Sequence, residues 1–196
     1  MRVLLACNHS AALPDAFASK GHYVLSVDMK PPDHDHDHYQ GDIFDVDFLN
    51  YDLMIACPPC TFLSNVCPLN RRDPSRIRSA QFAAHFFLRL YHAPVKMICI
   101  ENPVGLMNKY FRRPDMILNP FNFGEAERKR SCFWLKNLPP LIYGCQTDKT
   151  AKEFTSSGNP KYFCDTGARS VHRGAGGPRS IFFKSIALAM ADQWNY

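Results

Sequence analysis

Residues 51–64 read YDLMIACPPCTFLS, and this stretch decides how the rest of the chain is interpreted. Its apolar run, residues 53–56, lies between Asp52 and a double proline, which is typical of a buried strand in a parallel sheet. Neither proline has an N–H to continue the hydrogen bonding of a sheet, so we expect the strand to end near Cys57. Cys60 then follows on a stiff turn beyond the carboxyl end of that strand, where ligands bind in open α/β sheets. A thiol in this position is a candidate nucleophile.

Cys57 and Cys60 also form a C-x-x-C pair, which allows two further interpretations. Such a pair can be redox-active or can contribute to a zinc site. Cys67 adds a third cysteine, but no second C-x-x-C follows, so a four-ligand zinc site is incompletely supplied. For Cys57 we expect a side chain facing the core, because cysteines outside disulfides are often buried.

The composition indicates one globular domain. The chain has 196 residues, of which 46% are hydrophobic and 21% are charged, so it has ample material for a core. No stretch approaches the length of a membrane span, and the apolar run at the N-terminus is too short for a signal peptide. The eight cysteines lack the spacing of a small disulfide scaffold, so we expect reduced thiols in a cytoplasmic protein.

The chain is mildly basic, with a formal net charge of +5 and a sequence pI of about 8.8. This fits a polyanionic partner. The basic residues form three groups: Arg71, Arg72, Arg76 and Arg78; Arg128, Lys129 and Arg130; and Lys161, Arg169, Arg173 and Arg179. Around a single site, such groups suggest contacts to phosphates.

The N-terminal part has the layout of a nucleotide-binding unit. We expect a strand over residues 2–6, a helix over residues 14–20 and a second strand over residues 22–27. Asp28 ends that strand, roughly 20 residues after the first strand, as an acidic residue does in dinucleotide-binding folds. A third short strand is expected just before Gly41, with Asp42 at its end.

The loop 31–40 contains a His/Asp run. In an extended chain His34, His36 and His38 would share one face. Imidazoles suit zinc or nickel, but we favour a solvated loop and expect no metal site.

The second half continues the alternation of helices and strands. A helix is expected over residues 74–92, followed by a buried strand over residues 95–100. Its expected core face consists of Phe82, Ala83, Phe86, Phe87 and Leu90. Glu101-Asn102-Pro103 would lie at the carboxyl end of the strand, where Glu101 is either a general acid or a turn residue. Further strands are expected near residues 116–118 and 131–135, and a terminal helix over residues 180–194.

These features form one pattern along the chain. Asp28 and Asp42 follow the second and third strands, Pro59-Cys60 follows the fourth, Glu101-Asn102 follows the fifth, and Arg128-x-Arg130 precedes a later strand. In this order the chain resembles DNA cytosine-C5 methyltransferases, in a compact version similar to those of bacteriophages. The resemblance implies a Rossmann-like class I methyltransferase fold, an α/β architecture with a mostly parallel central sheet and helices on both faces.

The resemblance also implies a reaction. A cytosine flipped out of DNA would enter the pocket, the Cys60 thiolate would attack C6, and Glu101 would hold and protonate N3. The methyl group would come from S-adenosylmethionine, while Arg128 and Arg130 would orient the base and offset negative charge.

The implied cofactor-binding residues are Cys7, Asn8, His9, Asp28, Asp42 and Pro58. The implied substrate-binding residues are Pro59, Asn102, Arg71 and Arg72. Residues 1–137 would form the catalytic core, 138–177 a reduced target-recognition segment, and 178–196 a terminal helix returning to the core. A phage protein would act in the cytoplasm of its bacterial host.

The chain departs from the family pattern at three places. The stretch 7–12, CNHSAA, has no glycine where the family has a glycine-rich loop, and His9 could fill the methionine pocket. Ala126 stands where glutamine is usual, and Ser185 where glycine is expected. Two alternatives therefore stay open. One is a relative of the fold that binds or acts on pyrimidine nucleotides or nucleic acid without S-adenosylmethionine. The other is a thiol-redox or zinc protein built on Cys57 and Cys60.

Overall fold

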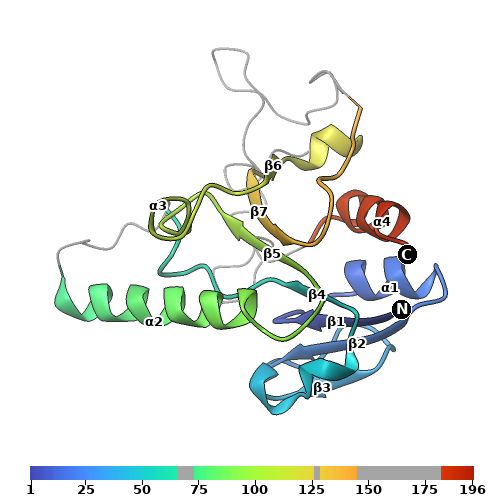
Figure 1. The fold of residues 1–196 in the computed structure, drawn as a ribbon, viewed down its shortest axis with the longest axis horizontal. Coiled ribbons are helices and arrows are strands. Elements are labelled where there is room, and N and C mark those ends of the chain that lie inside the picture. The colour runs from blue at the N-terminus through green and yellow to red at the C-terminus, as the bar shows by residue number, and fades with distance from the viewer. Residues whose placement is uncertain (66–72, 126–128, 145–181) are drawn as a thin grey trace.

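The computed structural model describes residues 1–65, 73–125, 129–144 and 182–196, and within them seven strands form one sheet in the order β3-β2-β1-β4-β5-β7-β6 (Figure 1). Five strands run parallel: β1 (Arg2–Ala6), β2 (Tyr23–Asp28), β3 (His38–Gln40), β4 (Leu53–Ala56) and β5 (Met97–Pro103). β7 (Ser131–Lys136) is antiparallel to both β5 and β6 (Met116–Leu118). The predicted α/β architecture with a mostly parallel sheet is confirmed.

Each face of the sheet has its own core, because alternate residues of a strand point to opposite faces. One core contains Val3, Leu5, Leu53 and Ile55, and the other contains Leu4, Ala6, Met54 and Ala56. Burial on both faces explains why β1 and β4 are continuous apolar runs rather than alternating ones.

Helices cover both faces of the sheet, as predicted (Figure 1). α1 (Ala12–Ala18) and α4 (Lys184–Gln193) contribute to the core that contains Leu5, and α2 (Pro74–Tyr91) contributes to the core that contains Leu4. α2 begins at Asp73, whose side chain accepts a hydrogen bond from the Ser75 N–H, with proline at the first helical position. The shorter elements are α3 (Met107–Tyr110) and the 3-10 turns η1 (Ile43–Asp45), η2 (Phe48–Asn50) and η3 (Pro120–Phe123).

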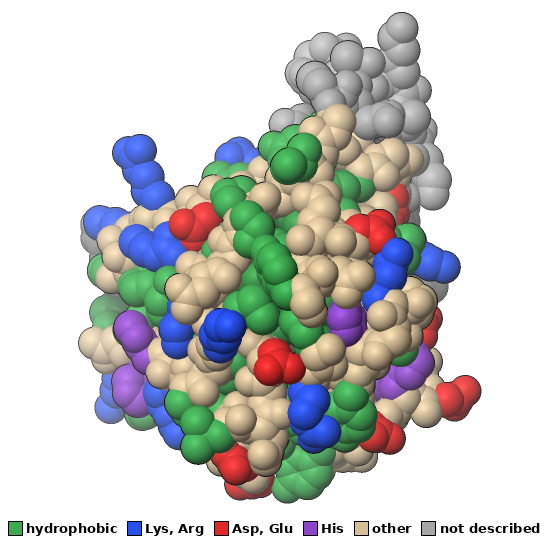
Figure 2. Space-filling view, turned by 45° about the vertical axis from the view of Figure 1, so that its right-hand side comes forward, with side chains coloured by type: hydrophobic (Ala, Val, Ile, Leu, Met, Phe, Trp, Pro, Cys, Tyr) green, Lys and Arg blue, Asp and Glu red, His purple; other side chains and the backbone are tan. Residues whose placement is uncertain are grey.

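On the face shown in Figure 2, Lys and Arg side chains predominate on the left, and Asp and Glu lie mainly along the lower and right edges.

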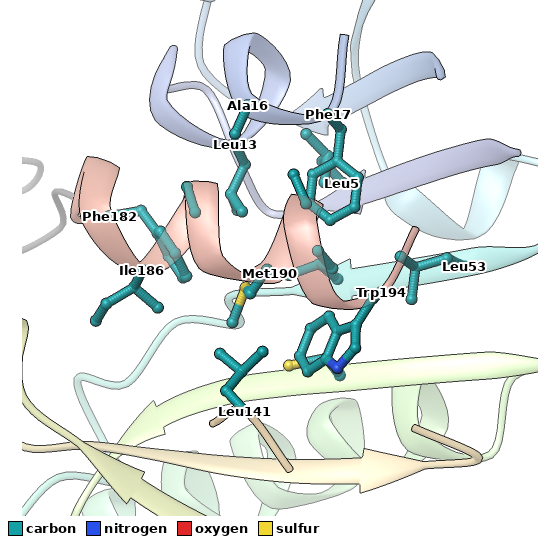
Figure 3. Packing of buried hydrophobic residues seen from close by; sticks show 14 of the residues in the cluster. Leu5, Leu13, Ala16, Phe17, Leu53, Leu141, Phe182, Ile186, Met190 and Trp194 are labelled. Carbon is teal, nitrogen blue, oxygen red and sulfur yellow. The ribbon is translucent and has the colours of Figure 1, made fainter. Parts of the chain in front are cut away.

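α4 brings the end of the chain back onto the core. Its apolar side chains, with the flanking Phe182 and Trp194, pack between α1 and Leu141 (Figure 3). Trp194 is fully buried, and its indole N–H donates to the Pro139 carbonyl over 3.0 Å. The Gln193 side chain hydrogen-bonds both backbone groups of Ile142. The beginning of the predicted target-recognition segment is therefore tied to α4, whereas residues 145–181 lie outside the described residues and the three-part division of the chain stays a prediction.

Two sequence predictions about helix and strand positions were wrong. Phe82 is 75% exposed, because the buried side of α2 is formed by Arg76, Phe87 and Leu90, and residue 82 lies beyond the edge of that side. The other residues of the predicted core face pack in or against the core: Ala83, Phe86, Phe87 and Leu90. β5 begins later than predicted and extends to Pro103, because β7 pairs with it up to Ser131. Glu101 therefore lies within β5, paired with β7, and not after the end of the strand as predicted.

The His/Asp loop folds back against β2 instead of being fully solvated. The buried hydroxyl of Ser26 lies 2.7 Å from His38 Nδ1 and 3.1 Å from His34 Nε2. His36 Nε2 lies 2.8 Å from the Asp15 carboxylate of α1. The three imidazoles therefore contact protein groups and brace the loop that leads into β3.

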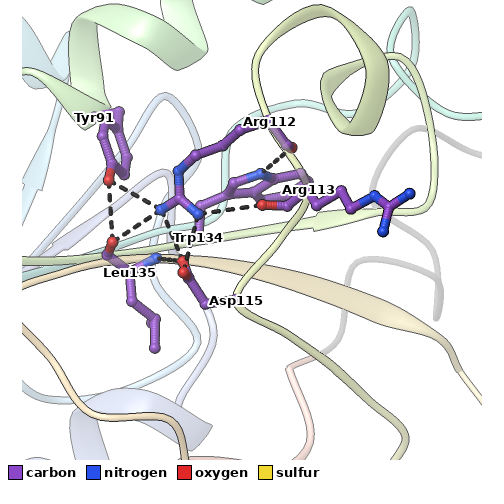
Figure 4. Close-up of polar contacts among 6 residues, drawn as sticks. All are labelled: Tyr91, Arg112, Arg113, Asp115, Trp134 and Leu135. Atoms are coloured by element: carbon purple, nitrogen blue, oxygen red, sulfur yellow. Dashed lines mark hydrogen bonds and ion pairs between the residues drawn. The ribbon is translucent and has the colours of Figure 1, made fainter.

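A polar network fastens the chain between α3 and β6 to the far end of β7 (Figure 4). The Arg112 guanidinium donates to both carboxylate oxygens of Asp115, at 2.9 and 2.7 Å, and also to the Tyr91 hydroxyl and the Leu135 carbonyl. Asp115 in turn accepts from the Leu135 N–H at 2.7 Å. Burial raises the pKa of Asp115, but the hydrogen bonds from Arg112 and Leu135 outweigh it and hold this pKa below its ordinary value.

Candidate active site

Four neighbouring strands are aligned near the carboxyl ends of β1 and β4. Val27, Ala6, Ala56 and Ile100 pair with one another across β2, β1, β4 and β5. The next residue of each strand falls in a common row, which consists of Asp28, Cys7, Cys57 and Glu101. This row lies beside the point where the strand order reverses between β1 and β4, which is the place where open α/β sheets bind ligands.

The backbone after β1 makes the sharp turn for which glycine is usual. Cys7 has a φ of 55°, in the left-handed region. The turn is fixed by Asn8, which is buried: its N–H donates to the Val27 carbonyl at 3.1 Å and its side-chain amide donates to the Ser10 carbonyl at 2.9 Å. Cys7 thus supplies a turn without glycine, at the cost of some backbone strain.

His9 contacts the carboxylate at the end of β2. Its Nδ1 lies 3.5 Å from Asp28 Oδ2, and both side chains are mostly buried, with exposures of 24% and 16%. The other oxygen of Asp28 accepts from the Lys30 N–H at 3.0 Å. The predicted cofactor-binding residues His9 and Asp28 are therefore adjacent, and they contact one another.

Asp42 caps the turn that follows β3. Its carboxylate accepts a hydrogen bond from the Phe44 N–H at 3.0 Å and is exposed. Burial, and to a lesser extent the nearby Asp28 and Asp42 carboxylates, raises the pKa of Cys7 to about 12. The two predicted carboxylates, Asp28 and Asp42, are thus both close enough to Cys7 to raise its pKa.

The Pro-Pro-Cys segment leaves β4 as predicted. β4 ends at Ala56, Pro58 is buried, and Pro59 and Cys60 are exposed. The Cys60 carbonyl accepts hydrogen bonds from the N–H groups of Leu63 (3.0 Å) and Ser64 (2.9 Å), which closes a tight turn. We call residues 60–65 the Cys60 turn.

β5 and the residues that follow it fix both the Cys60 turn and the proline segment before it. The buried Asn102 side chain donates to the Pro58 carbonyl at 2.9 Å. Further along, the Leu106 N–H donates to the Leu63 carbonyl at 2.8 Å, and a Cβ on Gly105 would stand 2.0 Å from that same oxygen. Sequence reasoning missed Gly105, because nothing in a single sequence separates a close backbone contact from an ordinary turn glycine.

The thiols of the row are unsuited to attack on a substrate. Burial is the main cause that raises the pKa of Cys57 well above its ordinary value, and electrostatic interactions with Glu101, Cys99 and Cys7 add to it. The positive charge of Lys129 has the opposite, smaller effect. Cys57 packs against the core on the α1 and α4 side, as predicted. Because thiolates are the reactive form, the neutral thiols Cys7 and Cys57 leave Cys60 as the exposed cysteine of this site among the described residues.

Two basic residues, Lys129 and Arg130, directly precede β7, the strand that pairs with Glu101. Glu101 pairs with Phe133 of β7. Burial raises the pKa of Cys132, Glu101 adds to the rise, and Arg130 opposes it, so both charges lie near this thiol. Lys129, which sequence reasoning did not assign to the site, acts on Cys57 and lies 5.7 Å from the ring centre of Phe183. Arg71, Arg72 and Arg128 lie outside the described residues.

The described residues contain no group of three or more His, Cys, Asp or Glu side chains that could hold a metal ion. In the same part of the chain, no helix has the length and apolar character that crossing a membrane requires.

No protein-family model and no curated protein matches the sequence. Among solved structures, the chain is similar to a crystal structure of a DNMT2 mutant from Spodoptera frugiperda, with 18% sequence identity and a TM-score of 0.48. The match covers 83% of this chain and 56% of the DNMT2 chain, so the chain spans just over half the length of that protein.

Proposed function

We propose that the protein is a cytosine-C5 methyltransferase that acts on nucleic acid, with Cys60 as its nucleophile. One observation carries the proposal. Cys60 is exposed just past the end of β4, on a turn that Asn102 and Gly105 hold against β5, while the thiols of Cys7 and Cys57 are held neutral nearby. A fixed, exposed thiol is what covalent addition to an electron-poor ring requires, and Glu101 at the same edge of the sheet would supply the carboxyl group.

The residues at the ends of β1, β2 and β3 fit S-adenosylmethionine. The left-handed backbone at Cys7 makes the turn that lets the chain pass close to a bound molecule. The Asp28 and Asp42 carboxylates, which both act on Cys7, are suited to accept hydrogen bonds from ribose and adenine groups. Asn8 and His9 would line the same place, and Pro58 would close it from β4. S-adenosylmethionine would supply the methyl group.

The remaining residues would handle the base. Cys60 Sγ would form a bond to C6 of cytosine, and Glu101 would donate a proton to N3, so that C5 becomes nucleophilic. After methylation, water would take the C5 proton, the bond to Cys60 would break and restore the thiolate, and N3 would return its proton to Glu101. Arg130 and Arg128 would orient the base, Pro59 and Asn102 would shape the pocket, and Arg71 and Arg72 would contact phosphates.

A second function is favoured by the contact between His9 and Asp28. If His9 keeps Asp28 from accepting a ribose hydroxyl, the same Cys60 and Glu101 would serve a protein that binds or acts on pyrimidine nucleotides or nucleic acid without S-adenosylmethionine.

Calorimetric titration with S-adenosylmethionine and S-adenosylhomocysteine separates these two functions. The methyltransferase proposal requires micromolar binding that is lost in Asp28→Ala, followed by methyl transfer to cytosine in DNA that is lost in Cys60→Ser. Absence of binding at millimolar ligand contradicts the methyltransferase proposal and favours the second function.

A further inference from the structure

Two exposed aromatic side chains, each with a basic neighbour, lie on the helices next to the Cys60 turn. Tyr110, the last residue of α3, is 68% exposed, and the ammonium of the exposed Lys109 lies 6.0 Å from its ring centre. On α2, the Phe82 side chain is 75% exposed, and Arg78, one helical turn earlier, is exposed as well. Neither aromatic ring contributes to the core.

Both helices are attached to the Cys60 turn. α3 follows directly after Leu106, whose N–H donates to the Leu63 carbonyl. On α2, the buried Arg76 has its guanidinium 5.8 Å from the ring centre of Phe62. Both helices therefore lie beside the turn at which the target base would be held.

The charge of this part of the chain suits a polyanion. Between Asp73 and Asp115 the sequence has seven Lys and Arg residues and one acidic residue, Glu101. Within α2 there is no acidic residue at all. Lys109 and Arg78 are thus free of acidic neighbours along their own helices and can approach phosphates.

We propose that Tyr110 with Lys109, and Phe82 with Arg78, hold an unpaired nucleic-acid strand beside the target base. The proposal rests on the function proposed above, since it places the target base at Cys60. Aromatic rings stack on the faces of unpaired bases, and basic side chains follow the phosphates, which is how proteins hold single strands. In a duplex these faces are covered by neighbouring base pairs, so the two aromatic rings indicate a single-stranded substrate.

The test is fluorescence anisotropy with a short labelled, cytosine-containing DNA strand, measured as the single strand and as its duplex. We expect the wild type to bind the single strand more tightly than the duplex. Tyr110→Ala and Phe82→Ala should each weaken single-strand binding about ten-fold. Lys109→Gln and Arg78→Gln should each reduce the slope of log K against log salt by about 0.7.

Matched control variants are available away from the Cys60 turn. Tyr196 is 66% exposed at the end of the chain, and Lys96 is exposed before the start of β5. Tyr196→Ala and Lys96→Gln should leave single-strand affinity unchanged. Equal affinities for Tyr110→Ala, Phe82→Ala and wild type would overturn the proposal, as would a preference for duplex that neither variant alters.

Single-strand affinity is measured without the cofactor, so it does not depend on whether the protein binds S-adenosylmethionine. S-adenosylhomocysteine binding, measured on the same proteins by calorimetry, reports on the methyltransferase proposal, and we expect it to be equal in wild type and Tyr110→Ala. A protein that fails to bind S-adenosylhomocysteine but binds single strands through Tyr110 and Phe82 would retain the surface and lose only the proposed reaction.

Discussion

The side-chain amide of Asn102 donates a hydrogen bond to the carbonyl oxygen of Pro58, with 2.9 Å between nitrogen and oxygen. The double proline offers carbonyl acceptors but no N–H donors, so a side-chain donor is needed to fix it. Asn102 meets this need from β5, while Glu101, one residue earlier, points to the other face of the sheet. Two consecutive residues thus serve two purposes: one fixes the loop that leads to Cys60, and the other supplies a carboxyl group.

Asn102→Asp removes the donor and sets a carboxylate against the Pro58 carbonyl. Because a buried acceptor loses its partner, we expect the free energy of unfolding to fall by about 1–3 kcal/mol, together with loss of methyl transfer. Urea denaturation measures the first effect. Asn50→Ala, which removes an exposed hydrogen bond to Asp47, is the control and should change stability by less than about 0.5 kcal/mol. Unchanged stability in Asn102→Asp would contradict the anchoring role.

Gly105→Ala tests whether close backbone contact fixes the Cys60 turn. A Cβ at this position would lie 2.0 Å from the Leu63 carbonyl oxygen, so the turn must shift. We expect methyl transfer to fall at least about ten-fold, with a loss of stability of about 1–3 kcal/mol from overpacking. Gly144→Ala is the matched control, because nothing lies within 4 Å of its added Cβ. Full activity in Gly105→Ala would show that the position of the turn does not matter.

His9→Ala tests whether His9 competes with the cofactor for Asp28. A partly exposed pair of this kind contributes up to about 1 kcal/mol, so releasing Asp28 should tighten S-adenosylhomocysteine binding by about three-fold. Calorimetry measures the change. Weaker binding by the variant would instead show that His9 contributes a favourable contact to the cofactor.

The network around Arg112 should give a pH-dependent contribution to stability. The pKa of Asp115 is lower in the folded protein than its unfolded value of about 3.9. Its stabilisation is therefore complete above about pH 4 and is lost as the pH falls through the folded pKa. We expect Asp115→Asn to cost about 1–2 kcal/mol at neutral pH, and the difference from wild type to shrink in acid. A difference that stays constant with pH would exclude the carboxylate as its source.

The strands could be predicted because burial on both faces leaves a direct mark on the sequence. β1 and β4 are apolar throughout, and the prolines after Ala56 mark where pairing must end. The start of α2 was equally readable, since Asp73 and Pro74 are local signals that need no tertiary partner. Asp28 at the end of a strand followed from the same reasoning.

Features that depend on tertiary contacts could not be predicted in this way. The predicted core face of α2 was right for Ala83, Phe86, Phe87 and Leu90, but the exposure of Phe82 depends on how wide a side of the helix meets the core, which the aromatic spacing does not tell. The pairing of His9 with Asp28 joins a loop to the end of β2, and the role of Gly105 depends on a carbonyl more than 40 residues earlier in the chain. The roles of Cys60, Glu101, Arg128 and Arg130 stay predictions.

Covalent trapping tests the central claim most directly. DNA in which the target cytosine carries fluorine at C5 has no C5 proton to lose after methylation, so the bond to the nucleophile should persist. Incubation with S-adenosylmethionine should then yield a protein–DNA adduct that peptide mass spectrometry maps to Cys60, and none should form with Cys60→Ser. No adduct, or an adduct that maps to Cys57 or Cys7, would contradict the account.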